Sequence, residues 1–224
     1  PAGKATYSTD NIYVSDWDMT FMVSSNGLAL DDNYECKYAV GSLYQISGDM
    51  ILSNSDDIVT IYGFSDQDEL NSIRIPNGVT SIGDNAFDDC YNLTSVNIPE
   101  SVTSIGYAAF AYCENLMSVI IPNGVTNIGD EAFSACYSLT SINIPESVTS
   151  IGEYAFHDCD LTGIIVDEGN KVYYSSGNCL IERESQTLIL GCNTSVIPAD
   201  VTSIGNSAFY ACRSLTSITI PDSV

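Results

Sequence analysis

Apolar residues return to the same places every 23 residues over most of this chain. Isoleucine–proline pairs mark the period most clearly, and they stand at 75–76, 98–99, 121–122, 144–145, 197–198 and 220–221. A fixed period of roughly 20 to 50 residues indicates one small structural unit stacked on copies of itself. Stacked units bury a continuous core and create a long surface, so we expect a solenoid.

Each repeat opens with a short apolar alternation that predicts a β-strand. In residues 93–99 the first, fourth and sixth residues are apolar, which is the L-x-x-L-x-L signature of leucine-rich repeats. Proline then ends the strand, because it has no N–H to donate to a neighbouring strand. A turn and a second extended piece follow, as in residues 79–82. In segments such as 84–90 we expect one or two helical turns, with Asp84 or Asn85 able to cap the free N–H groups.

One repeat is longer than its neighbours and predicts an insertion. It occupies residues 166–197, where apolar residues 179–181 and 187–190 flank a polar turn at 183–186. Two apolar runs separated by a short polar turn are typical of a β-hairpin. Insertions in solenoids form loops on one face, and that face is often a functional one.

The N-terminal region does not follow the period. Segments 17–30 and 41–63 are rich in tyrosine, isoleucine, valine, methionine and phenylalanine, and they predict β-strands. We expect the nearest strand, residues 58–62, to pair with the first repeat strand and to cap the open end of the solenoid, which is otherwise an unpaired edge. This divides the chain into an N-terminal β cap at 1–69 and a solenoid at 70–224.

The charge of the chain limits its partners. Six lysine and arginine residues stand against 29 aspartate and glutamate residues, which gives a formal net charge of −23. Nucleic acids and anionic membranes are bound through clustered lysine and arginine, so we expect neither partner. No apolar run approaches the ~18 residues of a membrane span, and residues 1–10 lack the basic start and apolar stretch of a signal peptide. Because the chain starts without methionine and stops in mid-repeat at Val224, we expect a fragment whose targeting and anchoring segments lie outside it.

The repeat is specific enough to suggest a family. The motifs Val-Thr-Ser-Ile-Gly, Ala-Phe-x-x-Cys, Leu-x-Ser-Ile and Ile-Pro resemble the BspA-type bacterial leucine-rich repeat over residues 70–224. Residues 167–173 with 188–189 also resemble the longer, hairpin-bearing repeat of that family. The resemblance implies a right-handed leucine-rich-repeat solenoid, mostly β with short helical turns. It further implies a secreted or surface-displayed protein of a host-associated microbe, used in adhesion or recognition, with no shared catalytic residues and no cofactor.

Five cysteines occupy one repeat position and are expected to stack as a ladder, namely Cys90, Cys113, Cys136, Cys159 and Cys212. Stacked coils lie roughly 4.8 Å apart, a separation that a disulfide tolerates. Pairing would twist the stack and leave one member out, whereas free cysteine packs as a small buried apolar residue. We therefore favour reduced structural thiols over disulfides or a metal site. The states of Cys36, Cys179 and Cys192 stay open, and a Cys179–Cys192 bridge across the hairpin is one alternative.

His157 is the single histidine, so any histidine-dependent mechanism has to use it. Catalysis would also require a nucleophile and a pocket. The same repeat position holds several unlike residues elsewhere, namely Asp88, Ala111, Ser134 and Tyr210. This variety favours a solvent-facing turn for His157.

Acidic clusters at 31–35, 66–69 and 88–89 offer the oxygen ligands that Ca²⁺ prefers, but none has the spacing of an EF-hand loop. We interpret them as solvated charge that keeps the surface soluble. The paired carboxylates of a glycosidase need an enclosed cleft, which solenoid faces rarely form. We therefore expect no enzyme and no metal site.

The candidate binding site is the set of strand positions that should line the exposed face, namely Asn71, Arg74, Thr94, Asn97, Met117, Ile120, Thr140, Asn143, Thr162 and Ile165. Stacking is expected to place Met117 beside Ile120, with Ile165 two coils along. An exposed apolar patch rimmed by asparagine and threonine is a common interaction signature. The alternatives are ordinary scattered surface residues or cover by a neighbouring domain. Tyrosines near the turns could add contact area, among them Tyr91, Tyr112, Tyr137 and Tyr210.

These patterns favour an extracellular or cell-surface recognition and adhesion module. Its partner would be a host or microbial extracellular protein, bound on the strand-lined face. One alternative is a carbohydrate-binding accessory module, in which tyrosine, asparagine and threonine contact a glycan. Another is a passive spacer that displays some other domain. We expect no membrane insertion by this part of the protein.

Overall fold

A computed structural model describes six segments of the N-terminal region and residues 72–75 and 79–224, with side chains described at 72, 73, 75 and 79–224. In the N-terminal region the described strands are β1 (Thr6–Tyr7), β2 (Ile12–Tyr13), β3 (Phe21–Val23), β4 (Tyr44–Ser47), β5 (Met50–Ser55) and β6 (Ile58–Phe64). Among the described residues, no helix has the length and apolar character of a membrane span.

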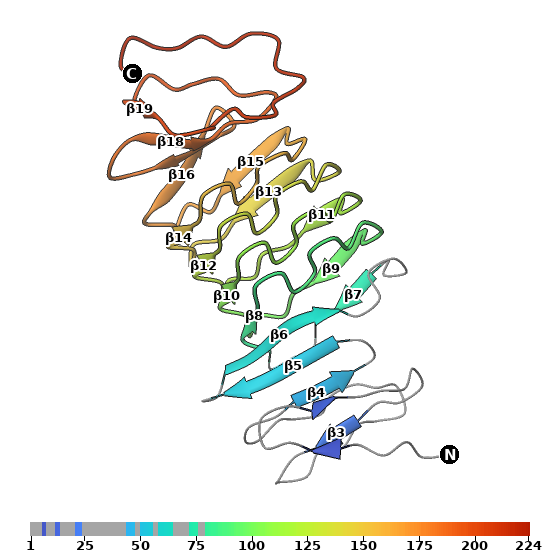
Figure 1. The fold of residues 1–224 in the computed structure, drawn as a ribbon. Helices are drawn as coiled ribbons and strands as arrows, with labels where there is room; N and C mark the ends of the chain where they lie inside the picture. Colours follow the sequence, from blue (N-terminus) through green and yellow to red (C-terminus); the bar gives the residue numbers. More distant parts are fainter. Residues whose placement is uncertain are drawn as a thin grey trace.

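From residue 72 to residue 151 each coil contributes one strand to each of two rows, and β15 adds a fifth strand to the first row (Figure 1). The first row contains β7 (Ser72–Arg74), β9 (Ser95–Asn97), β11 (Ser118–Val119), β13 (Ser141–Ile144) and β15 (Gly163–Val166). The second row contains β8 (Ser81–Ile82), β10 (Ser104–Ile105), β12 (Asn127–Ile128) and β14 (Ser150–Ile151). The strands within β7–β9–β11, within β13–β15 and within the second row pair in parallel. The predicted solenoid is therefore confirmed.

The register of the pairs follows the period of the sequence. Ser95 pairs with Ser118, and Ser81 pairs with Ser104, so each residue faces its own equivalent in the next coil. Period-two alternation then points every second side chain inward. Each coil adds the same apolar set to one core, as the repeat predicted.

Phenylalanine and cysteine ladders run through this core. The rings of Phe87, Phe110, Phe133 and Phe156 stack with centroids 5.1 to 5.4 Å apart. Three ladder thiols donate to the phenylalanine carbonyl of the coil before them, whereas Cys212 contacts the carbonyl of Gly191. The Sγ atoms of Cys113, Cys136 and Cys159 lie 3.2 Å from the carbonyl oxygens of Phe87, Phe110 and Phe133. The cysteine position thus adds a hydrogen bond between coils. The carbonyls of Phe87 and Phe110 also accept from the backbone N atoms of Cys90 and Cys113, both at 3.3 Å.

The segments after each glycine corner form chains of tight turns, and the predicted helical turns are absent from residues 79–224. Positive φ angles interrupt them, 54° at Asn85 and 61° at Asp89, and such left-handed residues cannot continue a helix. The backbone N of Asn85 instead donates to the carbonyl of Tyr107 in the next coil at 2.8 Å. The prediction that Asp84 caps a helix was also wrong. Its Oδ1 bonds to the next coil instead, where it accepts from the backbone N of Tyr107 at 2.8 Å.

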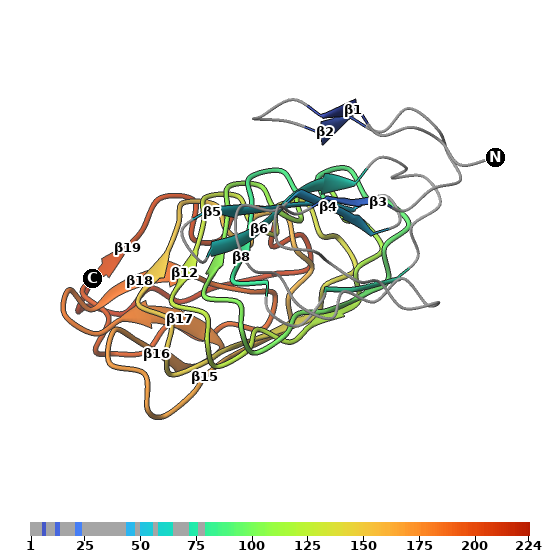
Figure 2. The ribbon, with the colours of Figure 1, turned by 90° about the horizontal axis from the view of Figure 1, so that it is seen from below.

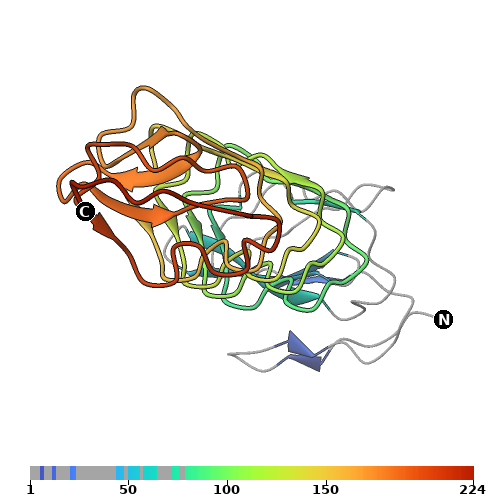
Figure 3. The same ribbon diagram turned by 90° about the horizontal axis from the view of Figure 1, so that it is seen from above.

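The predicted hairpin is confirmed, with a third strand beside it. β17 (Cys179–Glu182) pairs antiparallel with β18 (Thr187–Leu190), and β16 (Tyr173–Ser176) pairs antiparallel with β17. β18 also pairs in parallel with β19 (Ser203–Ile204), which starts the final coil. Seen from above, the orange hairpin strands lie across the end of the stacked coils (Figure 3). The insertion therefore separates the final coil from the regular ones.

The strand nearest to the solenoid has a different partner from the one predicted. β6 pairs in parallel with β8 of the second row rather than with β7, as Figure 2 also shows. The register sets Thr60 against Ser81 and Ile61 against Ile82, so β6 continues the hydroxyl–isoleucine pattern of the second row. β5, β4 and β3 follow in an antiparallel order. The side chains of these strands lie outside the described ones, so the capping of the core stays a prediction.

Glycine at the corner of each coil allows the coils to stack closely. A Cβ atom on Gly129 would stand 2.6 Å from the backbone carbon of Gly106. We expect Gly129→Ala to lower the free energy of unfolding by about 3 kcal/mol, because backbone atoms cannot yield as a side chain does. Gly163→Ala is the matched control, since its Cβ would meet Ser141 Cβ at an ordinary 3.7 Å. Urea unfolding of both variants measures the difference, and equal stability of the two would contradict the prediction.

Candidate functional site

The outward side chains of the first strand row form a face that we call the strand face. β9 sets the pattern, with Ser95 and Asn97 exposed and Val96 buried between them. The pleat of the strand places alternate residues on opposite sides, so Val96 joins the core while its neighbours meet solvent. β13 shows the same alternation.

Most of the predicted site residues lie on this face. Seven of them are exposed, namely Asn97, Met117, Ile120, Thr140, Asn143, Thr162 and Ile165, whereas Thr94 is half-buried. Asn71 lies outside the described residues. Only the backbone of Arg74 is described, and it pairs with Asn97.

Pairing between coils brings these positions together. The backbone N of Met117 donates to the carbonyl of Thr94 at 3.3 Å. Asn143 pairs with Ile165 across β13 and β15. The exposed fractions are 62% for Met117, 81% for Ile120 and 59% for Ile165, so none of these apolar side chains belongs to the core.

Sequence reasoning missed two exposed features, one beyond the first strand row and one on the strand face. Val196 is 70% exposed and stands directly before Ile197-Pro198, as Ile120 stands before Ile121-Pro122. The Ile-Pro marker was the signal for it, although the insertion hides the period there. The second feature lies on the strand face. It is a row of exposed serines at the third position of the L-x-x-L-x-L motif, namely Ser72, Ser95, Ser118 and Ser141. Period-two alternation from the inward valine or isoleucine would have found them.

The described side chains of the strand face carry no charge, although the chain has a net charge of −23. Serine, threonine, asparagine, methionine and isoleucine occupy all of its described positions. The centres of protein–protein interfaces are depleted of charged residues and enriched in methionine and aromatic residues. The strand face shares with such centres the lack of charge and an exposed methionine, whereas its row of serines is not typical of them.

The second row of strands presents a different surface. The hydroxyls of Thr103, Thr126 and Thr149 each donate to the backbone carbonyl of the equivalent threonine one coil earlier, at 3.0 to 3.2 Å. The Oγ atoms of Ser81 and Ser104 lie 2.9 Å apart. These hydroxyls are already used between coils, so this surface offers little apolar area and few unused hydrogen bonds.

The cysteines of the described residues are free thiols. The ladder members Cys90, Cys113, Cys136 and Cys159 are buried, and Cys212 is half-buried. Cys179 and Cys192 form no bridge, and the Sγ of Cys192 lies 3.5 Å from the carbonyl oxygen of Asn178. Cys36 lies outside the described residues. Burial raises the pKa of Cys179 and, with the effect of Cys192, raises that of Cys212 to about 11, so neither is a reactive thiolate at neutral pH.

The interpretation of His157 as a solvent-facing residue was wrong. Its side chain is 19% exposed and stacks on Tyr210 with ring centroids 3.8 Å apart. The ring also lies edge-on to Tyr154, with centroids 5.0 Å apart. Tyr210 belongs to the coil after the hairpin, so this contact bridges the insertion and could not be found from the repeat position alone.

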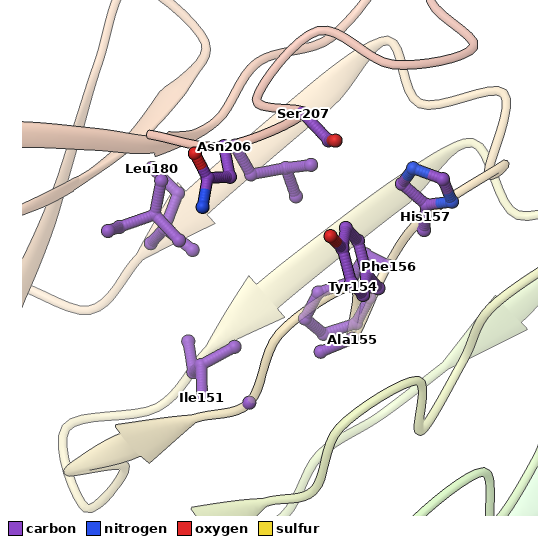
Figure 4. A pocket seen from close by; sticks show the side chains of 11 residues that line it. Ile151, Tyr154, Ala155, Phe156, His157, Leu180, Asn206 and Ser207 are labelled. Atoms are coloured by element: carbon purple, nitrogen blue, oxygen red, sulfur yellow. The ribbon is translucent and has the colours of Figure 1, made fainter. Parts of the chain in front are cut away.

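A small cavity lies beside His157 where the last regular coil meets the hairpin (Figure 4). Ile151, Phe156 and Leu180 supply apolar walls, and Asn206 and Ser207 come from the final coil. Its lining includes His157, Tyr154 and Ser207 but no carboxylate, lysine or cysteine. Within residues 79–224, no group of three or more metal-ligating side chains is positioned to hold an ion.

Comparisons with known proteins agree with this description. The model of the BspA type leucine rich repeat region matches residues 57–179 and 190–224, in 6 copies. No curated protein shows significant similarity to the chain.

Solved structures with this fold come from several bacteria. A leucine-rich repeat protein from Eubacterium ventriosum is 26% identical, with a TM-score of 0.58 over 80% of this chain and 59% of its own. One from Bacteroides capillosus is 30% identical, with a TM-score of 0.50 over 55% of this chain and 98% of its own. The T. pallidum leucine-rich repeat protein, at 23% identity, shares the fold with a TM-score of 0.57 over 75% of this chain and 88% of its own. The chain thus spans little more than half of the Eubacterium protein.

The repeat model covers more than half of the chain, and the matched residues include the coils that build the strand face. The chain therefore belongs to the BspA-type leucine-rich repeat family.

Proposed function

We propose that the chain is a recognition and adhesion module that works outside the cell and binds a protein ligand through the strand face. One observation carries this proposal. Met117, Ile120 and Ile165 are exposed apolar side chains on a face whose described side chains carry no charge, in a strongly acidic chain. Membership of a leucine-rich repeat family associated with surface and adhesion proteins supports the location.

The physical basis is the removal of apolar area from water on a surface that exists before binding. Burial of exposed apolar side chains is favourable by about 25 cal/mol per Å². The backbone of the face is held by parallel pairing between coils, for example Ser141–Ile144 against Gly163–Val166. A face that is already ordered loses little conformational entropy when it binds. The surrounding serine, threonine and asparagine side chains can supply the polar rim that interfaces have.

We expect Met117→Asp combined with Ile120→Asp to abolish ligand capture, because two carboxylates would have to lose their water in the interface. Both side chains are exposed, so the fold should remain. The matched control is Asn127→Asp with Ser150→Asp, which adds the same charge to exposed positions of the second row. Circular dichroism checks the folding of both variants. Retained capture by the folded Met117/Ile120 variant would contradict the placement of the site.

The ligand itself is sought with a binding screen against host extracellular-matrix proteins and a glycan array at physiological salt. A protein that binds at high salt and is lost in the Met117/Ile120 variant supports the proposal, because an apolar contact is not screened by ions. A glycan signal lost on tyrosine-to-alanine changes would move the function to carbohydrate binding. No binding on either screen would favour a passive spacer.

A further inference from the structure

We propose that the turn side of the solenoid carries a second docking surface, which binds arginine-rich segments of a partner protein. The surface consists of Tyr91, Tyr112 and Tyr137 with Glu114, and we call it the tyrosine strip. It lies on the tight-turn segments, whereas the strand face lies on the first strand row. The two surfaces are therefore independent of each other.

Three members of the tyrosine strip form one column across consecutive coils. Tyr91, Glu114 and Tyr137 each stand directly after the ladder cysteine of their coil. Stacking hydrogen bonds join these places, since the Nδ2 of Asn115 donates to the carbonyl of Tyr91 at 2.7 Å and the backbone N of Ser138 donates to the carbonyl of Glu114 at 3.1 Å. An acidic side chain therefore alternates with two exposed tyrosine rings.

Tyr112 extends the strip beside this column, at the positive-φ place of its tight turn. Its φ angle is 56°, and its side chain is exposed. The equivalent places in the neighbouring coils hold Asp89, Ala135 and Asp158, also at positive φ. Aspartate and small residues adopt this region more readily than a bulky aromatic residue does. The positive φ is a property of the tight turn that recurs from coil to coil, and at this place Tyr112 puts a third exposed ring beside the column.

An arginine of the same chain shows which chemistry this surface receives. The Nη2 of Arg213 lies 3.1 Å from Oδ1 of Asp158, and its guanidinium carbon lies 5.7 Å from the ring centre of Tyr137. Arg213 comes from the coil after the hairpin, 55 residues beyond Asp158. A second such pair, Arg183 over Tyr174 at 5.1 Å, occurs in the hairpin. A planar guanidinium stacks on a ring and pairs with a carboxylate at once, which a compact ammonium group does less well.

The charge around the tyrosine strip favours a cationic partner. Residues 79–160 contain 11 aspartate and glutamate residues and no lysine or arginine. Burial raises the pKa of Tyr137, and the carboxylates of Asp158 and Glu114 raise it further. A field of one sign steers an oppositely charged partner to the surface, and the tyrosine rings then distinguish arginine from lysine.

The test measures fluorescence anisotropy of labelled deca-arginine and deca-lysine with the intact chain at low salt, about 50 mM, where surface charge is weakly screened. We expect deca-arginine to bind more tightly than deca-lysine. The triple variant Tyr91→Ala, Tyr112→Ala, Tyr137→Ala should lose about tenfold in affinity for deca-arginine. Tyr107→Ala, an exposed tyrosine outside the strip, is the aromatic control. Glu114→Gln should weaken binding more than Glu153→Gln, which changes the net charge by the same amount elsewhere.

Three results would overturn the proposal. The wild-type chain could fail to bind deca-arginine, the triple variant could bind as tightly as the wild type, or the two peptides could bind equally. Equal binding of the peptides would show attraction by net charge alone. The Met117/Ile120 variant should bind deca-arginine unchanged, so failure of the strand-face proposal is distinguishable from failure of this one.

Discussion

Replacement of Asn170 by alanine is expected to lower the free energy of unfolding by about 4 kcal/mol, a large part of the stability of a typical domain. The side chain is 1% exposed and makes four hydrogen bonds. Its Nδ2 donates to the carbonyls of Pro145 and Val148, both at 2.9 Å. Its Oδ1 accepts from the backbone N atoms of Val172 and Tyr173 at 2.9 and 2.8 Å. One amide therefore joins the last regular coil to the start of the hairpin.

Alanine at this place removes the Asn170 donor from the Val148 carbonyl and the Asn170 acceptor from two N–H groups, and each buried group left unpaired costs about 1–3 kcal/mol. The Pro145 carbonyl keeps the backbone N of Val148 as a donor at 3.3 Å. The changed segment can relax or admit water, so the total falls below the sum of these costs. Asn170→Asp should be at least as destabilising, because its carboxylate would place an oxygen against the carbonyls of Pro145 and Val148. Asn143→Ala, at an exposed asparagine of the strand face, is the control and should change stability by less than about 0.5 kcal/mol.

Urea unfolding followed by circular dichroism measures all three variants. Equal stability of Asn170→Ala and Asn143→Ala would show that the hairpin is held in some other way. Unfolding of the hairpin at a lower urea concentration than residues 79–160 would instead show that Asn170 stabilises the junction between the last regular coil and the hairpin.

Features that repeat within one coil were predictable from the sequence. The inward residues Leu93, Val96 and Ile98 follow from spacing alone, because an apolar alternation can bury only one side of a strand. The hairpin between 179 and 190 was predictable for the same reason, since two apolar runs flank a polar turn. The exposed places of Met117 and Ile120 follow once the inward residues are known. These features depend on local pattern, which the period confirms several times over.

Features that depend on contacts between coils were not predictable. The tight turns replace helical turns because their N–H groups bond to the next coil, as Asn85 bonds to Tyr107. Asp84 resembles a helix cap in sequence but accepts a hydrogen bond from that same coil. The environment of His157 depends on Tyr210, which lies beyond the insertion. A residue's role in these cases is decided by a neighbour that the sequence does not place beside it.

The solenoid is expected to lose stability steeply as the pH rises above about 9. Burial raises the pKa of Cys90 from 9.0 to about 12, with Asp88 and Asp89 adding to the effect. Burial also raises the pKa of Cys113, and a hydrogen bond with Cys159 together with burial raises that of Cys136. The folded chain therefore keeps thiol protons that the unfolded chain gives up.

The sign of the pH dependence follows from this difference. Below the unfolded pKa both states hold their protons, and the full stability is present. Above about pH 9 the unfolded chain binds fewer protons, so the free energy of unfolding falls until the pH passes the folded pKa, near 12 for Cys90. Each such thiol contributes about 1.4 kcal/mol per pH unit, and three together approach about 4 kcal/mol per pH unit. The pKa of Tyr174 is raised to about 12, mainly by burial, and this tyrosine adds to the loss only above about pH 10.

The interval from about pH 9 to about pH 10 therefore isolates the thiols, and urea midpoints measured across it test the prediction. Cys136→Ala removes one titrating group and should reduce the slope by about 1.4 kcal/mol per pH unit, even though it also lowers stability at neutral pH by removing the thiol hydrogen bond to the Phe110 carbonyl. The change in slope separates titration from packing, because a packing loss is independent of pH. A thiol reagent should leave the folded ladder unmodified at about pH 8 and react after unfolding. The thiol contacts with the carbonyls of Phe87 and Phe110 keep the ladder thiols buried and protonated in the folded chain. A constant urea midpoint between pH 8 and pH 10 would contradict this, because it would mean that the thiols ionise as readily in the folded chain as in the unfolded one.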